Sequence, residues 1–412
     1  MKARRDLVWL LESGELISGM ETELLSIGYA SSTINRYTRV AYRFYEWYNE
    51  QKLLFSSNLD EAIQLFLSHY ESTCTHGIRS SRYKENHAAL NQLRKFSNKR
   101  KDYPSCKKAI SCCPVQTELN AFDKHLEKVC GLSLATRISR KQFVSTFLSQ
   151  QFGSGPVVTD GFTPRNLMNY VSSQARGYSP GTASVMATAI RSYLKFLQFR
   201  GDIDARLVRL IPAPAKWRLA DYPIVVSDSQ VNSLIKSFDI KSVSGMRDHA
   251  MALCMLNMGL RAGEVAGLSL DDFDWRQSIL HLYRGKSRIC RELPLMNSCG
   301  SSIARYLKHG RPFSESRIVF LRHTVPVGSA IKTENVRGAM RRAYARAGFP
   351  TTWTGTHILR HTAATRMLNN GASLKEVADV LGHQSIDTTV IYTKVHTTAL
   401  ETVVQPWPGV LL

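Results

Sequence analysis

The chain has 412 residues and a formal net charge of +21, with 54 Lys and Arg against 33 Asp and Glu. At roughly 150 residues per domain, this length predicts two to three domains. A hydrophobic content of 43% is enough for folded cores and excludes a disordered chain. The positive charge favours a polyanionic partner, most simply a nucleic acid. Residues 222–412 carry 23 basic and 14 acidic side chains, a net +9, which leaves +12 for the remainder. Charge spread in this way suits a protein that surrounds its ligand.

Other classes of protein are disfavoured. No apolar run approaches the roughly 18 residues of a membrane helix, and Glu12 interrupts the first apolar stretch too early for a signal peptide. Eight cysteines without a Cys-x-x-Cys pair predict reduced thiols and a cytoplasmic location. Cys106, Cys112 and Cys113 form a loose cluster between two prolines, which is a weak zinc candidate.

The first half of the chain reads as two helical blocks, residues 1–105 and 119–211, joined by a linker at 106–118. The amphipathic segments predict helices over 32–47, 59–67 and 84–96 in the first block and over 135–147, 162–171 and 179–196 in the second. Corresponding features lie about 100 to 104 positions apart, as in Phe96 and Phe196. Duplication of one unit stays open, because any two amphipathic four-helix units share such spacing.

A second linker at 212–222 separates these blocks from residues 223–412. Pro212, Pro214 and the flanking Pro223 break any helix there. The last block is mixed: two helical segments (229–238 and 248–259) precede two strands (278–283 and 289–295) that form a hairpin around Lys286. From Ile331 onward the pattern is helical. Asn370-Gly371 predicts a helix end, and Ser373 with Glu376 predicts a capping box.

Several helix entrances and the second linker offer contacts for DNA phosphates. Helix N-termini and hydroxyl groups bind phosphate, and Arg or Lys adds charge. The alternative, that these side chains only cap helices or face solvent, stays open. The candidates are Thr136, Arg137 and Arg140 at one entrance, Arg176, Ser179 and Thr182 at another, and Lys216 and Arg218 in the linker.

The segment from Thr356 to Thr362 holds two histidines four residues apart, His357 and His361. A zinc-protease helix needs Glu directly after the first His, but Ile358 stands there, and Arg360 would repel a metal ion. A phosphate-binding loop around Lys286 fails too, because Leu280 stands where its first Gly is required. We therefore expect no metal, no nucleotide and no other cofactor.

Five short motifs follow one another in a fixed order. They are Gly-Leu-Arg261-x-x-Glu264, Lys286 on a hairpin, His357-x-x-Arg360, Gly-His383 and, nine residues later, Tyr392. Together they resemble the tyrosine recombinase (phage integrase) family. The resemblance covers residues 119–412 and implies a multidomain, mainly α protein. It would combine a helical, SAM-like core-binding domain, or two of them, with a mixed α+β catalytic domain that carries a small hairpin sheet. Residues 1–105 lie outside the family's two-domain pattern.

The resemblance also implies a role for each motif residue. Tyr392 would attack the scissile phosphorus and form a 3′-phosphotyrosine, which conserves the bond energy without ATP. Arg261 and Arg360 would hold the two non-bridging oxygens, since guanidinium makes charged bidentate contacts. Lys286 would protonate the leaving 5′-oxygen, His357 would exchange a proton with Tyr392, and His383 would donate to a phosphate oxygen. Glu264 is expected to fix the Arg261 segment and His361 to be a packing residue.

The implied partners are double-stranded DNA with specific recombination sites and further copies of the chain, a monomer when free and a tetramer in the synapse. Accessory recombinases or DNA-bending proteins fit the same picture, as does a mobile element that encodes the protein. The apolar tail at 399–412 is expected to dock on a neighbouring copy. Two alternatives remain: a topoisomerase of type IB chemistry and a catalytically silent DNA-binding protein. Residues 1–105 are an arm-site binder, a second core-binding unit or a surface for partner proteins.

Overall fold

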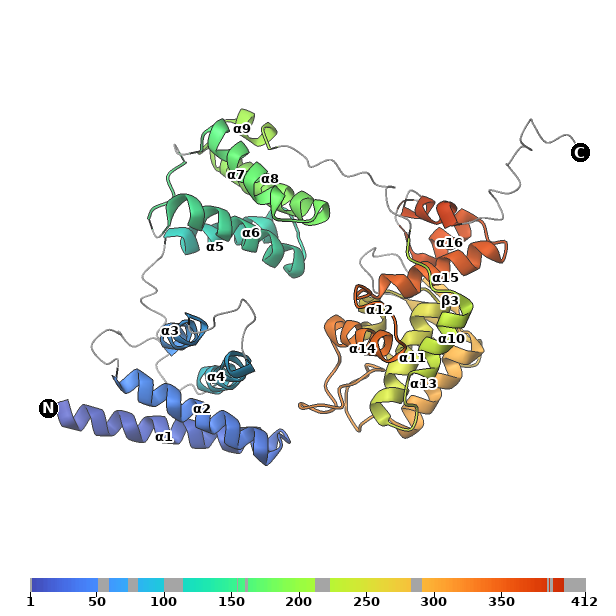
Figure 1. Ribbon diagram of the computed structural model, residues 1–412, viewed down its shortest axis with the longest axis horizontal. Helices are drawn as coiled ribbons and strands as arrows, with labels where there is room; N and C mark the ends of the chain where they lie inside the picture. The colour runs from blue at the N-terminus through green and yellow to red at the C-terminus, as the bar shows by residue number, and fades with distance from the viewer. Residues whose placement is uncertain are drawn as a thin grey trace, which may run out of the picture. The chain divides into compact units, whose positions relative to one another are not determined.

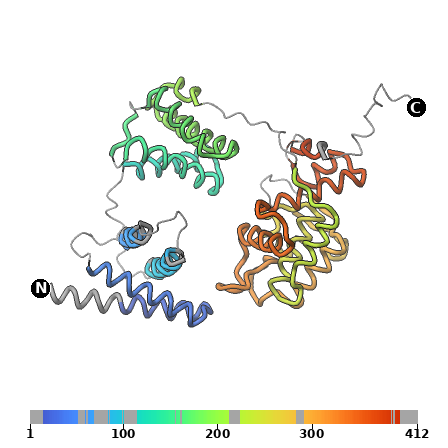
Figure 2. Tube along the Cα trace, in the orientation of Figure 1, coloured from blue at the N-terminus to red at the C-terminus, as the bar shows by residue number. Residues whose placement is uncertain are grey.

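The computed structural model of the chain describes residues 2–50, 59–72, 81–99, 114–153, 155–159, 162–211, 223–282, 291–383, 385 and 388–395. Figures 1 and 2 trace the chain from its N-terminal helices to the helical and hairpin-bearing C-terminal part. The expected fold class is confirmed, because helices dominate and one small sheet lies in the last block. None of the described helices has both the length and the apolar character that crossing a bilayer requires.

Residues 2–99 form four helices: α1 (Lys2–Ser26), α2 (Ser31–Glu50), α3 (Leu59–Ser72) and α4 (Ser81–Lys99). The last three were expected from their apolar spacing, whereas α1 was not. Ile17 of α1, Phe44 of α2, Phe66 of α3 and Leu90 of α4 are all buried. The rings of Phe44 and Phe66 meet edge to face, 5.4 Å apart. The segment thus has an apolar core of its own.

Residues 114–211 form a second set of helices: α5 (Pro114–Lys128), α6 (Leu134–Phe152), α7 (Pro164–Arg176), α8 (Pro180–Arg200) and the short α9 (Ala205–Arg209). Hydroxyl caps at Ser133, Thr163 and Ser179 begin the middle three. Helix α5 begins at Pro114, within the segment 106–118 that the sequence pattern assigned to a linker. Proline is well tolerated at the first position of a helix, where its missing N–H has no partner to lose.

The two helical segments share one arrangement of neighbours. In each segment the first helix contacts the second, the second contacts the fourth, and the fourth also packs against the first and the third. The buried aromatic pairs recur as well: Phe44 lies 5.4 Å from Phe66, and Phe147 lies 4.8 Å from Tyr170. The likeness extends from sequence spacing to three-dimensional packing.

Residues 223–395 pack around α11 (Val243–Asn257), which contacts α13 (Asn297–His309), α14 (Thr333–Arg346) and α15 (His357–Asn369) (Figure 1). Met255 of α11, Ile303 of α13 and Met340 of α14 are fully buried in this core. The remaining elements are α10 (Asp228–Lys236), α12 (Ala262–Gly267), η2 (Leu270–Asp272), α16 (Leu374–Leu381) and η4 (Val390–Val395).

The predicted hairpin is present. β2 (Ile279–Leu282) pairs antiparallel with β3 (Arg291–Pro294), and Leu280 lies opposite Leu293, both facing the core. A two-residue strand, β1 (Phe273–Asp274), pairs with the other edge of β2. Two residues are too few to show the alternation of apolar and polar side chains that indicates a strand, so the sequence did not predict β1. Lys286 belongs to the segment between β2 and β3, outside the described residues.

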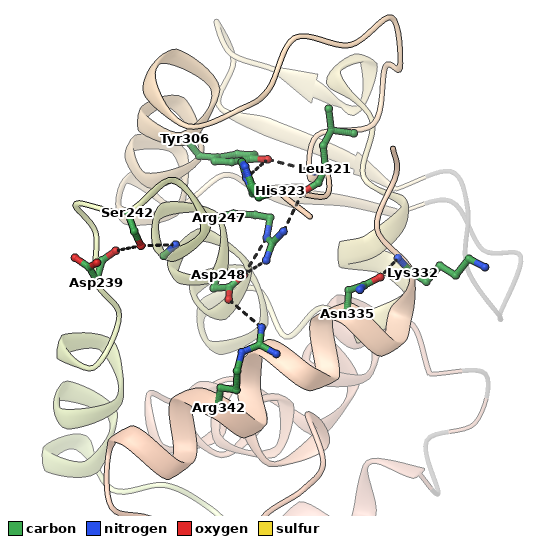
Figure 3. A network of polar contacts seen from close by, with 11 residues as sticks. Asp239, Ser242, Arg247, Asp248, Tyr306, Leu321, His323, Lys332, Asn335 and Arg342 are labelled. Atoms are coloured by element: carbon green, nitrogen blue, oxygen red, sulfur yellow. Dashed lines mark hydrogen bonds and ion pairs between the residues drawn. The ribbon is translucent and has the colours of Figure 1, made fainter. Parts of the chain in front are cut away.

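A buried ion pair helps to hold α11 in place (Figure 3). The Arg247 guanidinium donates to Asp248 Oδ1 from Nε at 2.9 Å and from Nη2 at 2.6 Å, and its Nη1 donates to the Leu321 carbonyl at 3.0 Å. Arg342 reaches Asp248 from α14, with 3.6 Å between Nη2 and Oδ2. This network ties α11 to α14 and to the segment that follows α13.

Candidate functional site

Helix α15 carries two of the motif residues, His357 and Arg360, and Arg360 is buried within the domain. Its side chain is 3% exposed, and it donates to the Gly259 carbonyl from Nη1 and to the Leu381 carbonyl from Nη2, both at 2.5 Å. Desolvation, followed by the nearby Arg261 charge, lowers the pKa of Arg360 to about 10. The guanidinium still carries its charge at neutral pH and bridges two segments far apart in sequence.

Arg261 stands directly before α12 and is held by Glu264. The Glu264 carboxylate accepts from Arg261 Nη1 at 2.9 Å and from the Arg261 backbone N–H at 2.7 Å. The second guanidinium nitrogen, Nη2, donates to the Gly382 carbonyl at 3.2 Å. Glu264 therefore fixes the Arg261 segment, as expected from the Gly-Leu-Arg-x-x-Glu motif.

Arg291, the first residue of β3, is a site residue that the sequence reasoning missed. Its Nη2 lies 2.8 Å from Glu264 Oε2, and its Nη1 donates to the Val380 carbonyl at 2.6 Å. Arg360 Nη1 lies 4.0 Å from the same carboxylate oxygen. Three guanidinium groups thus surround one buried carboxylate. The available signal was the position of Arg291 directly after the hairpin turn.

Two glycines let the backbone approach these arginines. Gly259 has φ 64° and Gly382 has φ 60°, a region that costs an L-residue energy. A Cβ on Gly382 would lie 2.9 Å from Arg291 Nη1, and one on Gly259 would lie 2.4 Å from a Leu381 methyl carbon. The Gly-Leu-Arg and Gly-His motifs therefore need glycine for the close packing of the site as well as for the turn.

Tyr392 lies in η4 with 2% of its surface exposed. Its ring packs in a small apolar cluster with Leu368, Val377 and Leu381. Its hydroxyl lies 3.0 Å from His361 Nδ1. The structure differs here from the expectation that His357 is the partner of Tyr392.

His357 occupies the first turn of α15 and is exposed. Its ring centroid lies 6.2 Å from that of His361. Both histidines share one face of the helix, but only the second one reaches the phenol.

Burial and the arginines shift the titration of the site. Desolvation is the main cause that lowers the pKa of His361 and of His383 to about 4, with His357 and Arg360 adding to the shift of the first ring and Arg360 to that of the second, so both rings are neutral at pH 7. Desolvation raises the pKa of the Tyr392 phenol, while the Arg360 and Arg261 charges act in the opposite direction. His383 Nδ1 lies 2.8 Å from Thr389 Oγ1.

The residues expected to contact DNA in the second helical segment have different surroundings in the structure. Arg137 forms a bidentate ion pair with Asp123, at 3.0 Å for each bond, and also contacts Glu127. This partly buried guanidinium is therefore engaged by two carboxylates of α5. Arg140 donates to Ser192 Oγ at 2.9 Å, and Arg176 is exposed at the end of α7.

The hydroxyl candidates act as helix caps. Ser133 and Ser179 accept from the backbone N–H groups of Thr136 and Thr182, and each serine Oγ lies 3.0 Å from the threonine Oγ1. The capping alternative thus holds for both pairs, although their outer faces are accessible. Lys216 and Arg218 fall in the segment 212–222, outside the described residues. Within the described ranges, no group of three His, Cys, Asp or Glu side chains is arranged to hold a metal ion.

Residues 225–398 match the family model of the phage integrase family. Tyrosine recombinase XerD of Lacticaseibacillus casei is 30% identical over 279 residues, which cover 66% of this chain and 92% of XerD. The chain belongs to the tyrosine recombinases of the phage integrase family. A Sinorhizobium fredii protein named integrase/recombinase y4rA is 37% identical over 295 residues, 72% of each chain.

Solved recombinases share the fold. The XerH site-specific recombinase matches with a TM-score of 0.54 at 18% identity, over 83% of this chain and 93% of XerH. The Tn1549 transposon integrase matches with the same TM-score at 16% identity, over 69% of this chain and 98% of its own. The recombinase described here is a site-specific enzyme that breaks and rejoins DNA strands.

Proposed function

We propose that this recombinase cleaves DNA through a 3′-phosphotyrosine at Tyr392, held at a phosphate site made by Arg261 and Arg360. The convergence of these three side chains from separate segments carries the proposal. Arg360 and Arg261 both contact the 381–382 backbone, and the charges of both act on the Tyr392 phenol. A nucleophile beside two fixed cations suits attack on a phosphodiester.

In the proposed step, the phenolic oxygen forms a bond to phosphorus while the bond from phosphorus to the 5′-oxygen breaks. Arg261 and Arg360 bind the non-bridging oxygens, where negative charge grows in the transition state. Lys286 protonates the leaving 5′-oxygen, and His383 donates a hydrogen bond to the phosphate. The reverse attack by a 5′-hydroxyl rejoins a strand, so the cycle needs no ATP, metal or other cofactor.

A suicide DNA substrate tests this assignment. The substrate carries a nick near the cleavage site, so that the 5′-end diffuses away and the covalent adduct accumulates. The wild-type protein should form an adduct that resists boiling in detergent, and Tyr392→Phe should form none. A persistent adduct from Tyr392→Phe would overturn Tyr392 as the nucleophile.

We propose DNA contacts on the second helical segment and, separately, on α14. In the former, Arg176 is exposed and Arg140 is partly buried, while Ser179 caps α8 and the exposed or partly exposed Thr136 and Thr182 lie in the first turns of α6 and α8. In α14, exposed Arg337 and Arg341 were not among the sequence candidates, and the charge of Arg337 adds to desolvation and to the Arg360 charge in lowering the pKa of His357. The Tn1549 integrase was solved in complex with transposon right end DNA and the lambda integrase bound to a core site, which supports DNA as the ligand.

We further propose that a free monomer assembles into a tetramer that synapses two specific sites, with accessory recombinases or DNA-bending proteins as further partners. The apolar tail at 399–412 would dock on a neighbouring copy, and the enzyme would act at the nucleoid. The tail lies outside the described residues. Its deletion should abolish strand exchange between two duplexes while adduct formation on one duplex persists. Unchanged assembly and exchange would contradict this role.

Residues 1–99 we propose to be a second bundle of core-binding type. The support is the shared pattern of helix neighbours, together with the exposed Arg36 and Arg39 on α2. Charge reversal at Arg39 should weaken DNA binding and leave the unfolding temperature unchanged. Equal affinity would favour a partner-protein surface instead.

A further inference from the structure

We propose that His361 positions the Tyr392 phenol and accepts its proton during attack on the scissile phosphate. This inference rests on the proposed function of Tyr392 as nucleophile. It assigns a catalytic task to a histidine that the motif His357-x-x-Arg360 does not include. Proton acceptance is thus assigned to a residue one helical turn beyond His357 on α15.

The geometry is that of a direct hydrogen bond. His361 Nδ1 and Tyr392 Oη are 3.0 Å apart, and the ring centroids are 5.5 Å apart at an interplanar angle of 58°. A base within 2.6 to 3.2 Å of the proton-bearing atom satisfies the first requirement for proton transfer. The phenol is otherwise packed among apolar side chains, so this bond fixes its direction.

The protonation state suits an acceptor. Desolvation and the charges of His357 and Arg360 lower the pKa of His361 to about 4, so the ring is neutral at pH 7. A neutral imidazole with its hydrogen on Nε2 presents Nδ1 as an acceptor. The phenolic O–H then donates to Nδ1.

No other group around His361 fills this role as well. The titratable or charged groups that face it are His357 and Arg360 on α15, Tyr392 on η4 and His383 after α16. Arg360 is a cation and has no acceptor. The Nδ1 atom of His383 is engaged with Thr389, and His357 is exposed at the helix entrance.

The proposed step balances. The phenolic O–H bond breaks, its proton moves to His361 Nδ1, and the oxygen electron pair forms the bond to phosphorus. The bond from phosphorus to the 5′-oxygen breaks, and that oxygen keeps its electron pair and takes a proton from the general acid. The bound phosphate is an anion, so it stabilises the imidazolium that forms and raises its pKa from the free-protein value. On rejoining, the imidazolium returns its proton to the phenol.

The experiment separates attack from departure of the leaving group. Single-turnover cleavage is measured for wild type, His361→Ala, His361→Asn and His357→Asn on two suicide substrates. One substrate has a natural 5′-oxygen, and the other has a 5′-bridging sulfur, whose thiolate departs without a general acid. We expect His361→Ala to be slower by about 10²-fold or more on both substrates.

His361→Asn keeps an acceptor near the position of Nδ1 but cannot take the proton. It should be faster than His361→Ala, remain at least about 10-fold below wild type, and lose the fall in rate on the acid side of the pH profile. His357→Asn should retain that acid limb. Thermal melting checks the fold of each variant, and if His361→Ala melts early, the pH profile of His361→Asn decides.

Three results would overturn the inference: wild-type cleavage by His361→Ala, recovery of its rate by the bridging sulfur, or an acid limb that persists in His361→Asn and disappears in His357→Asn. Failure of the proposed function looks different. In that case the wild type forms no adduct, or Tyr392→Phe still forms one. A wild-type adduct that needs Tyr392 but not His361 removes only the present inference.

Discussion

Glu264 binds Arg261 at both its backbone and its side chain, with 2.7 Å from Oε2 to the backbone nitrogen and 2.9 Å from Oε1 to Nη1. One carboxylate therefore sets both the start of α12 and the direction of the guanidinium. The same carboxylate meets Arg291 at 2.8 Å. Its removal should leave two arginines without their shared anion.

The first prediction concerns Glu264→Gln, which keeps the shape of the side chain and removes its charge. We expect the free energy of unfolding to fall by about 3 kcal/mol, because a buried ion pair loses one partner. Adduct formation should slow as Arg261 loses its orientation. Urea denaturation and suicide-substrate kinetics measure both effects. Glu334→Gln is the control, since its pair with Arg337 is exposed, and equal effects of the two variants would contradict the argument.

The second prediction concerns Arg360→Lys. A lysine cannot bridge the Gly259 and Leu381 carbonyls and still face a phosphate, because it has one ammonium group in place of a planar fork. We expect the single-turnover cleavage rate to fall by about 10²–10³, with DNA affinity little changed. Arg366→Lys on the same helix is the matched control, because its contact with Asp228 lies at the surface. A comparable loss in Arg366→Lys would refute the assignment.

The third prediction concerns the stability of the site in acid. The pKa of His383 is about 4 in the folded protein, below the ordinary value of about 6.5. The unfolded chain therefore binds more protons than the folded one between these pH values. The contribution of neutral His383 to the free energy of unfolding is thus complete above about pH 6.5 and is lost as the pH falls toward 4. The difference in unfolding free energy between wild type and His383→Asn should accordingly shrink over this window in urea titrations. A difference that stays constant with pH would exclude this linkage.

The fourth prediction concerns the network in Figure 3. Asp248→Asn leaves the buried Arg247 without its anion and weakens the link to Arg342, so the unfolding free energy should fall by about 3–5 kcal/mol. Asp271→Asn breaks a solvent-exposed pair with Arg317 and should leave stability unchanged. Thermal and chemical denaturation of both variants measure the contrast. Similar losses of unfolding free energy in the two variants would show that burial does not determine how much these ion pairs stabilise the protein.

The fifth prediction separates two arginines of the second helical segment. Arg176→Ala should weaken DNA binding and reduce the slope of log affinity against log salt by about 1, as expected when one phosphate contact is lost. Arg137→Ala should lower the melting temperature instead, because Asp123 and Glu127 hold that guanidinium. Binding titrations at several salt concentrations measure the slopes. A reduced slope for Arg137→Ala would restore it as a DNA contact.

Sequence reasoning succeeded where a pattern has one structural solution. Alternating apolar residues around a Gly-Lys turn predict a hairpin, and the register of Leu280 with Leu293 agrees. The capping box at Ser373 and Glu376 is present, with Glu376 accepting from the Ser373 backbone. In both cases the determining contacts are local.

Contacts between residues far apart in the sequence could not be predicted, because several positions on one helix fit the same local pattern. His357 and His361 lie four residues apart on one helical face, so either could meet a tyrosine 31 or more positions away. The placement of η4 against α15 brings Tyr392 to His361. Likewise, α5 brings Asp123 beside Arg137, and no local pattern reveals this ion pair across 14 positions.

The ring of arginines around Glu264 has an electrostatic consequence. Arg261, Arg291 and Arg360 carry three positive charges against the single negative charge of the carboxylate, so the free site holds a surplus of two. A phosphodiester brings one negative charge, and the pentacoordinate phosphorane that follows attack by a deprotonated phenol brings roughly two. In the proposed mechanism the charge of this guanidinium–carboxylate set would therefore match the phosphorane better than the substrate, as expected of an enzyme that binds the transition state most tightly.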